Sequence, residues 1–215
     1  MYRADLRVAV GAAAAFVLLA VMVAAGWSPL VRLDTAVAHD MNAVAAAHPG
    51  LVKAMKILTN AAGPLVWRVV VVALGAVLLL RRQPRLAAFA FLVITVGGLL
   101  STAVKVIVDR TRPVVPHPYA NAAGMSFPSG HAATSVLACG VVLLLALPVL
   151  HGWWRALAWV LAVIVPVAVG YTRIGLDVHW VSDIVGGWLL GIAVVAAVHA
   201  AVRPAQALGS LPVSR

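Results

Sequence analysis

Three short motifs combine cationic, histidine and carboxylate side chains at spacings that suit anion chemistry. In the first, Lys105 and Arg112 stand seven residues apart and Pro113 follows. Seven residues make about two helical turns, so the two cations would share one helix face, and the proline predicts that the helix ends at Arg112. An Arg fork and a Lys point charge suit a phosphate group. The alternative is a positive cap on a helix C-terminus, with Asp109 pairing with Lys105.

The second motif is Phe127-Pro128-Ser129-Gly130-His131, directly before an apolar run. Pro and Ser in this position predict a helix start, whose free backbone N–H groups form an anion site. Gly130 would let an anion approach the backbone closely, and His131 would stand in the first turn beside it. The alternative is a simple N-cap followed by a histidine at the membrane interface.

The third motif opens the last apolar run, with Arg173, His179 and Asp183 in that order. His179 and Asp183 are four residues apart and would meet on one helix face. A carboxylate that accepts one ring N–H leaves the other ring nitrogen as a directed lone pair, which is how a nucleophile is activated. The alternatives are a pair that only pins the helix end, and a local Asp177–Arg173 ion pair.

The elements that must position these motifs are membrane helices. Of the 215 residues, 64% are hydrophobic and 10% are charged, which argues against an ordinary soluble enzyme. The net charge is +10 and all six acidic residues are Asp. The basic residues lie between apolar runs and not on one polar face, which favours a membrane protein and no nucleic-acid partner. The single cysteine, Cys139, cannot form an intrachain disulfide.

Six runs with one charge at most are long enough to cross a bilayer, which predicts an all-α, six-transmembrane-helix bundle forming one integral-membrane domain over 1–215. The predicted spans are 8–27, 61–80, 86–104, 132–150, 156–172 and 184–202. A cleaved signal peptide is the alternative for the first run, whose length favours a retained helix. The segment 28–60 mixes apolar and charged residues, which predicts interfacial amphipathic helices between the first two spans.

The short linker with Arg81, Arg82 and Arg85 favours cytoplasmic termini, so the three motifs would lie at the outer ends of the spans. The linker histidines are expected to be solvated, and of these His117 is the candidate to contact a substrate. Polar groups at membrane depth usually mark function. Three cations, two histidines and a helix start would repel one another without an anion, which argues for a phosphate ligand.

The order of these motifs resembles the type 2 phosphatidic acid phosphatase superfamily. The resemblance rests on Lys105-x6-Arg112-Pro113, Pro128-Ser129-Gly130-His131 and Arg173-x5-His179-x3-Asp183. One departure is Thr172 before Arg173, where that family often has Ser.

The resemblance implies a lipid phosphate or diphosphate monoester hydrolase that uses neither metal nor cofactor. It implies that His179 attacks phosphorus, that Asp183 holds its tautomer, and that His131 protonates the leaving oxygen and then activates water. It also implies a phosphate cradle, made by Lys105, Arg112, Ser129, Gly130 and Arg173.

Other functions stay open on the sequence alone. A phosphotransferase of the same fold would pass the phosphoryl group to an alcohol. A non-catalytic lipid- or anion-binding membrane protein would not need His179 as a nucleophile. A transporter is disfavoured because the polar groups lie at one interface. Phosphatidic acid, phosphatidylglycerophosphate and a polyprenyl diphosphate are all candidate substrates, and the expected partners are this lipid and the surrounding membrane lipids.

Overall fold

A computed structural model describes residues 2–115 and 118–202 of the chain. All regular structure in this part is α-helical, as the sequence predicts. The helices are α1 (Tyr2–Ala24), α2 (Ser28–Ala47), α3 (Pro49–Ala61), α4 (Pro64–Leu80), α5 (Pro84–Val108), α6 (Gly130–Ala146), α7 (Trp153–Gly175) and α8 (Val181–Val202). His117 and the tail 203–215 lie outside the described residues.

Proline marks the starts of four helices. Pro49, Pro64 and Pro84 open α3, α4 and α5, and Pro29 lies in the first turn of α2. Proline suits a first turn because its missing N–H would have no partner there and its φ angle is already helical. These prolines therefore divide a nearly continuous apolar sequence into separate helices.

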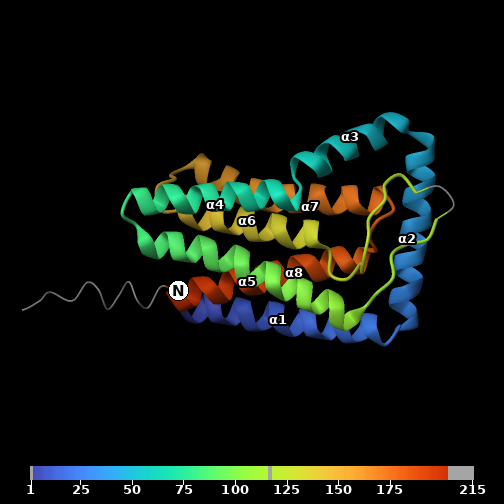
Figure 1. Cartoon of the computed structure of the whole chain (residues 1–215), viewed down its shortest axis with the longest axis horizontal. Helices are drawn as coiled ribbons and strands as arrows, with labels where there is room; N and C mark the ends of the chain where they lie inside the picture. The colour runs from blue at the N-terminus through green and yellow to red at the C-terminus, as the bar shows by residue number, and fades with distance from the viewer. Residues whose placement is uncertain (1, 116–117, 203–215) are drawn as a thin grey trace, which may run out of the picture.

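The predicted bundle of membrane helices is confirmed. Five helical stretches are long and apolar enough to cross a membrane: Arg3–Ala24, Pro49–Leu80, Pro84–Val108, Trp153–Gly175 and Val181–Val202. α6 is a shorter apolar helix that lies among them (Figure 1). α1, α4, α5, α6, α7 and α8 run along the long axis of the molecule, so their ends gather at two opposite faces.

Close packing of α8 against α6 fixes the two helices that begin at the second and third motifs. A Cβ atom on Gly187 would lie 2.7 Å from the backbone oxygen of Ser129. A Cβ on Gly191 would lie 2.8 Å from the Val136 side chain. Because both glycines lack that atom, the two helices approach at backbone distance over the first turns of each.

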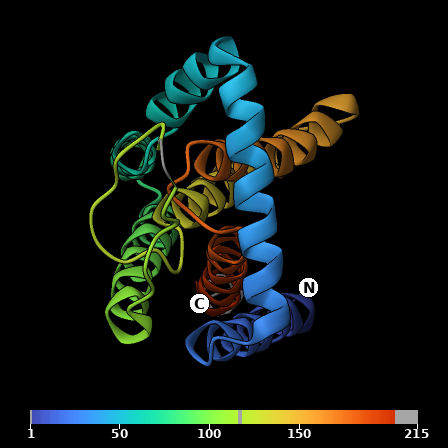
Figure 2. The ribbon, with the colours of Figure 1, turned by 90° about the vertical axis from the view of Figure 1, so that its right-hand side faces the viewer.

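The helices predicted for 28–60 are confirmed as α2 and α3. α2 crosses one end of the bundle nearly at right angles to the other helices (Figures 1 and 2). Ala45 of α2, together with Val52 and Met55 of α3, forms a small apolar core with Leu176 and Val178. Since Leu176 and Val178 belong to the α7–α8 linker, this core holds that linker against the end of the bundle.

Candidate active site

His179 and Asp183 form the pair that their spacing predicts, although His179 lies in the linker before α8. The imidazole Nδ1 is 3.1 Å from the Asp183 Oδ2, and both side chains are buried. The same oxygen accepts a 2.9 Å bond from the Trp180 backbone N–H. A carboxylate can only accept, so Nδ1 carries the ring proton and Nε2 presents a lone pair.

Burial controls the protonation of His179. Desolvation lowers the pKa of its imidazole to about 4, while the hydrogen bond to Asp183 and the charge of that carboxylate oppose the shift. The charges of Arg112 and Arg173 lower the pKa further. His179 is therefore a neutral imidazole at neutral pH, which is the form that can act as a nucleophile.

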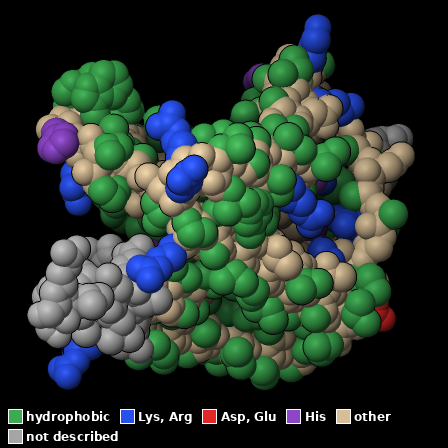
Figure 3. Space-filling view, turned by 60° about the vertical axis from the view of Figure 1, so that its left-hand side comes forward, with side chains coloured by type: hydrophobic (Ala, Val, Ile, Leu, Met, Phe, Trp, Pro, Cys, Tyr) green, Lys and Arg blue, Asp and Glu red, His purple; other side chains and the backbone are tan. Residues whose placement is uncertain are grey.

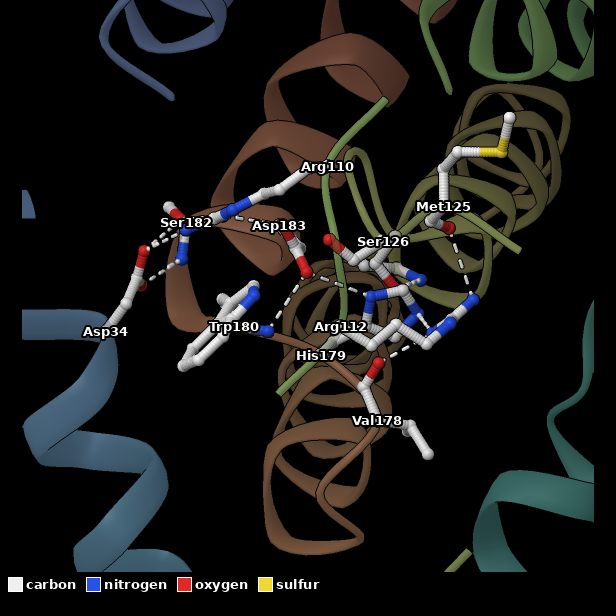
Figure 4. A network of polar contacts seen from close by, with 12 residues as sticks. Asp34, Arg110, Arg112, Met125, Ser126, Val178, His179, Trp180, Ser182 and Asp183 are labelled. Atoms are coloured by element: carbon white, nitrogen blue, oxygen red, sulfur yellow. Dashed lines mark hydrogen bonds and ion pairs between the residues drawn. The ribbon is translucent and has the colours of Figure 1, made fainter. Parts of the chain in front are cut away.

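Arg112 faces the free nitrogen of His179. Its Nη1 donates to the Val178 carbonyl at 2.6 Å and lies 3.3 Å from His179 Nε2 (Figure 4). Burial lowers the pKa of this guanidinium below its ordinary value, and the charge of Asp183 opposes the change. A phosphate that reached Nε2 would therefore lie beside the Arg112 guanidinium.

The prediction that Lys105 and Arg112 share a helix face is wrong, because α5 ends at Val108. Asp109 adopts a left-handed backbone conformation with φ of 45° and caps the helix through its N–H to the Lys105 carbonyl. Arg112 therefore lies in the linker that follows. The two cations still converge, because Lys105 Nζ and Arg112 Nη2 both donate to the Met125 carbonyl, at 3.0 and 3.2 Å.

The second motif begins α6 as expected. Ser129 is the N-cap, with its hydroxyl oxygen 3.5 Å from the Ala132 nitrogen and its own N–H bonded to the Asp183 carbonyl at 2.9 Å. Among the described residues, no atom of another segment lies within 4 Å of where a Cβ on Gly130 would stand, so there is space beside this helix start. His131 follows within electrostatic reach of Arg173, His179, Arg112 and Lys105.

Arg173 is a buried cation at the end of α7. Its side chain donates from Nη1 to the Thr59 hydroxyl at 3.0 Å, while its Nε has no hydrogen-bond partner among the described residues. The suggested ion pair with Asp177 does not form. Asp177 instead accepts a 2.8 Å bond from Asn42 of α2, which ties the α7–α8 linker to that helix.

The site therefore carries uncompensated positive charge. Within the described part of the chain, Lys105, Arg112 and Arg173 make no ion pair, while two buried carboxylates, Asp34 and Asp183, pair with Arg110. Figure 3 shows Lys and Arg side chains gathered in a hollow of an otherwise mainly apolar surface. One buried and two half-buried cations without counter-ions favour an anionic ligand.

Sequence reasoning missed two members of the site, Arg110 and Asp34. The Arg110 guanidinium lies 2.7 Å from Asp183 Oδ1 and 2.7 Å from Asp34 Oδ2. Two signals were present in the sequence: Arg110 stands two residues before Arg112 inside the first motif, and Asp34 is an acid placed between the apolar residues Leu33 and Ala36–Ala38 of 28–47. Neither signal predicts that the two meet.

The arrangement can perform phosphoryl transfer by positioning and charge neutralisation. It presents a neutral imidazole as nucleophile, cations around the attack position, and a second histidine at a helix start. No group of three or more His, Cys, Asp or Glu residues suited to a metal ion occurs in 2–115 and 118–202.

Comparisons with known proteins agree with this chemistry. The model of the PAP2 superfamily matches residues 86–207. The chain is 30% identical over 125 residues to phosphatidylglycerophosphatase B of Bacillus subtilis, which covers 57% of this chain and 61% of that relative. It is 44% identical over 66 residues to undecaprenyl-diphosphatase of Sulfolobus acidocaldarius, which covers 31% of this chain and 28% of that relative. The matches thus span less than two thirds of either relative's length.

A crystal structure shares the fold. It is that of a transmembrane PAP2 type phosphatidylglycerolphosphate phosphatase from Bacillus subtilis, and it matches with a TM-score of 0.80 at 22% sequence identity. The match covers 96% of this chain and 99% of the other. The likeness therefore extends beyond the motifs to α1, α2 and α3.

Proposed function

The chain belongs to the PAP2 superfamily, and on that basis we propose that it is a membrane phosphatase of a lipid phosphate or diphosphate monoester. The reaction proceeds through a phosphohistidine on His179 and needs no metal ion. The observation that carries this proposal is the position of Arg112, which makes no ion pair among the described residues and lies 3.3 Å from the His179 nitrogen that bears the lone pair, with Arg173 within electrostatic reach of the same ring.

In the first step the Nε2 lone pair of His179 attacks phosphorus. A P–N bond forms while the bond from phosphorus to the leaving oxygen breaks, and His131 gives that oxygen a proton. Asp183 stabilises the positive charge that develops on the imidazole, because its Oδ2 accepts the Nδ1 proton at 3.1 Å. Lys105, Arg112 and Arg173 neutralise the equatorial phosphate oxygens, with Ser129 and the Gly130 N–H completing the cradle.

In the second step water attacks the phosphohistidine. His131, now neutral, accepts a proton from that water as its oxygen bonds to phosphorus. The P–N bond breaks, its electron pair returns to Nε2, and inorganic phosphate leaves. The two histidines must begin in opposite protonation states, which requires different surroundings for each.

A lipid is the substrate class that fits the place of the site. The motifs meet at one end of the apolar bundle, beneath α2, where a phosphate headgroup can enter while its acyl or prenyl chain stays in the bilayer (Figure 2). The names of the two relatives supply the first candidates, phosphatidylglycerophosphate and undecaprenyl diphosphate. Phosphatidic acid is the third.

The direct test measures inorganic phosphate released from these three lipids by the purified protein in detergent, with EDTA present. We expect activity on at least one of them, and a loss of about 10³-fold or more in the His179→Ala variant. His151→Ala, which removes an exposed histidine in the α6–α7 linker, is the matched control and should keep full activity.

Two outcomes would overturn the proposal. Phosphate release that vanishes with EDTA and returns with a divalent ion would contradict the metal-independent mechanism. Full activity of His179→Ala would exclude this residue as the nucleophile. Adding an acceptor lipid separates hydrolysis from transfer, since a phosphotransferase would form a new phosphorylated lipid in place of free phosphate.

A further inference from the structure

A buried chain of charges lies behind the His179–Asp183 pair. Arg110 joins the two carboxylates, with Nη1 2.7 Å from Asp183 Oδ1 and Nη2 2.7 Å from Asp34 Oδ2 (Figure 4). The Asp34 and Asp183 side chains are 1% and 0% exposed, so neither carboxylate is solvated. Buried charges of this kind are stable only when paired, and Arg110 is the charged partner that both carboxylates share.

Asp34 also holds the start of α8, although it belongs to α2. Its Oδ1 accepts the Ser182 backbone N–H at 2.9 Å, and its Oδ2 accepts the Ser182 hydroxyl. Ser182 is the second residue of α8, so its N–H has no partner within the helix. A carboxylate at this point both caps α8 and suits the positive end of the helix dipole.

Arg110 is itself fixed on several sides. The Ser126 N–H donates to its backbone oxygen at 2.8 Å, and its guanidinium carbon lies 5.4 Å from the centre of the Trp180 ring. Trp180 in turn donates from Nε1 to the Thr111 carbonyl at 2.9 Å. Arg110 is thus ion-paired with two carboxylates, whereas Arg112 donates to backbone carbonyls and makes no ion pair among the described residues. This difference in charge balance excludes Arg110 from the phosphate cradle.

We propose that Asp34 and Arg110 are positioning residues, which orient the Asp183 carboxylate so that His179 Nε2 points at phosphorus. The inference rests on the proposed function. Arg110 occupies Oδ1 of Asp183, which leaves Oδ2 for the imidazole and prevents rotation of the carboxylate. Asp34 sets the angle of the Arg110 fork and balances its charge, so that Asp183 keeps its full negative charge for the developing imidazolium.

The proposal predicts that loss of the chain slows the chemical step and leaves substrate binding intact. Arg110→Gln should lower kcat by about 10- to 100-fold with little change in KM, which is the usual range for groups that orient a reacting ligand. Arg110→Lys should restore little, because an ammonium cannot bridge two carboxylates as a planar fork does. Asp34→Asn should give a smaller fall in kcat, since the amide oxygen still accepts the Ser182 N–H.

Matched controls of the same residue types exist on α2, the helix that carries Asp34. Asp40→Asn and Arg32→Gln change exposed side chains of α2 and should leave kcat unchanged. Arg112→Gln should raise KM, as expected for a group that touches the phosphate. The thermal unfolding midpoint of each variant in detergent shows whether the protein is still folded.

A double-mutant comparison separates positioning from a merely structural role. If Arg110 acts only through Asp183, the Arg110→Gln/Asp183→Asn protein will have the same kcat as Asp183→Asn alone. The inference would be overturned if the fold-loss in kcat of the double variant equalled the product of the losses in the two single variants. Full kcat in Arg110→Gln and Asp34→Asn would overturn it as well. Unimpaired activity of His179→Ala would instead overturn the proposed function, so the two failures are distinguishable.

Discussion

At the scale of single residues, the proposed mechanism makes the protonation of His179 the acid limit of the reaction. Burial lowers its pKa to about 4, despite the opposing effect of Asp183. The neutral, nucleophilic imidazole is present above this pKa and is lost as the pH falls through it. The surroundings of the linker between α7 and α8 therefore keep the His179 imidazole neutral at any pH near neutrality.

This shift predicts the acid limb of the pH profile. kcat/KM reports the ionisation of the free enzyme. It should therefore decrease as the pH drops below about 4 to 5, well under the pKa of 6.5 of an ordinary histidine. Because the reaction also needs a protonated acid, kcat/KM should decrease again at higher pH. The measurement is kcat/KM for one lipid between pH 3.5 and 9. A profile that is flat across this range, or an acid limb centred near pH 6.5, would contradict the assignment.

How far the site could be predicted depended on sequence distance. His179 and Asp183 are four residues apart on one segment, so their spacing sufficed to predict the pair, although His179 itself lies just before α8. Asp34 and Arg110 are 76 residues apart on different elements, and only the crossing of α2 over the bundle end brings them into contact. No periodicity carries that information.

At the scale of helices, glycine contacts between α6 and α8 set the distance between the two histidines. Gly187 approaches Ser129 and Ala133 through backbone atoms, which cannot move aside as a flexible side chain can. α6 carries His131 and α8 follows His179, so a change in their separation alters the geometry at phosphorus.

We therefore expect Gly187→Ala to damage both stability and activity. A methyl group 2.7 Å from the Ser129 oxygen forces the helices apart, and overpacking of this kind costs about 1–3 kcal/mol. Gly11→Ala in α1 is the matched control, because no atom of another segment lies within 4 Å of its Cβ position in the part of the chain that the structure describes. This variant should be neutral or slightly stabilising. Thermal unfolding and kcat in the same detergent measure both effects. Equal behaviour of the two variants would show that the contact does not matter.

Helix boundaries were less predictable than helix positions. Charge-free runs located the apolar segments, because charged residues are excluded from the hydrocarbon region. The end of α5 was placed four residues too late, since Pro113 restricts only its neighbour and gives no sign that Asp109 turns left-handed. The direction of α2 was likewise hidden, because amphipathicity predicts an interfacial helix but not which helix ends it crosses.

At the scale of the whole molecule, the basic residues divide into two groups. Arg81, Arg82 and Arg85 cluster at the α4–α5 connection, at the end of the bundle away from α2 (Figure 1). Lys105, Arg112 and Arg173 lie at the α2 end and face the site. Only the first group should count toward orientation by the positive-inside rule.

We accordingly propose that the protein lies in the cell membrane with both termini in the cytoplasm and the site on the outer face. A reporter enzyme that is active only outside the cytoplasm should be inactive when fused after Arg215 and active when inserted at Asp40, on the exposed face of α2. The reverse pattern would place the site on the cytoplasmic side.

In the proposed mechanism His179 becomes phosphorylated, and this intermediate can be trapped. His131→Ala should accumulate this intermediate with a diphosphate lipid, because a phosphate leaving group needs no proton whereas water attack has lost its base. With substrate labelled on the terminal phosphate and an alkaline quench, we expect acid-labile label on the peptide that contains His179, and none in the His131→Ala/His179→Ala protein. Label on another residue, or phosphate release by His131→Ala with no labelled protein at any time, would contradict it.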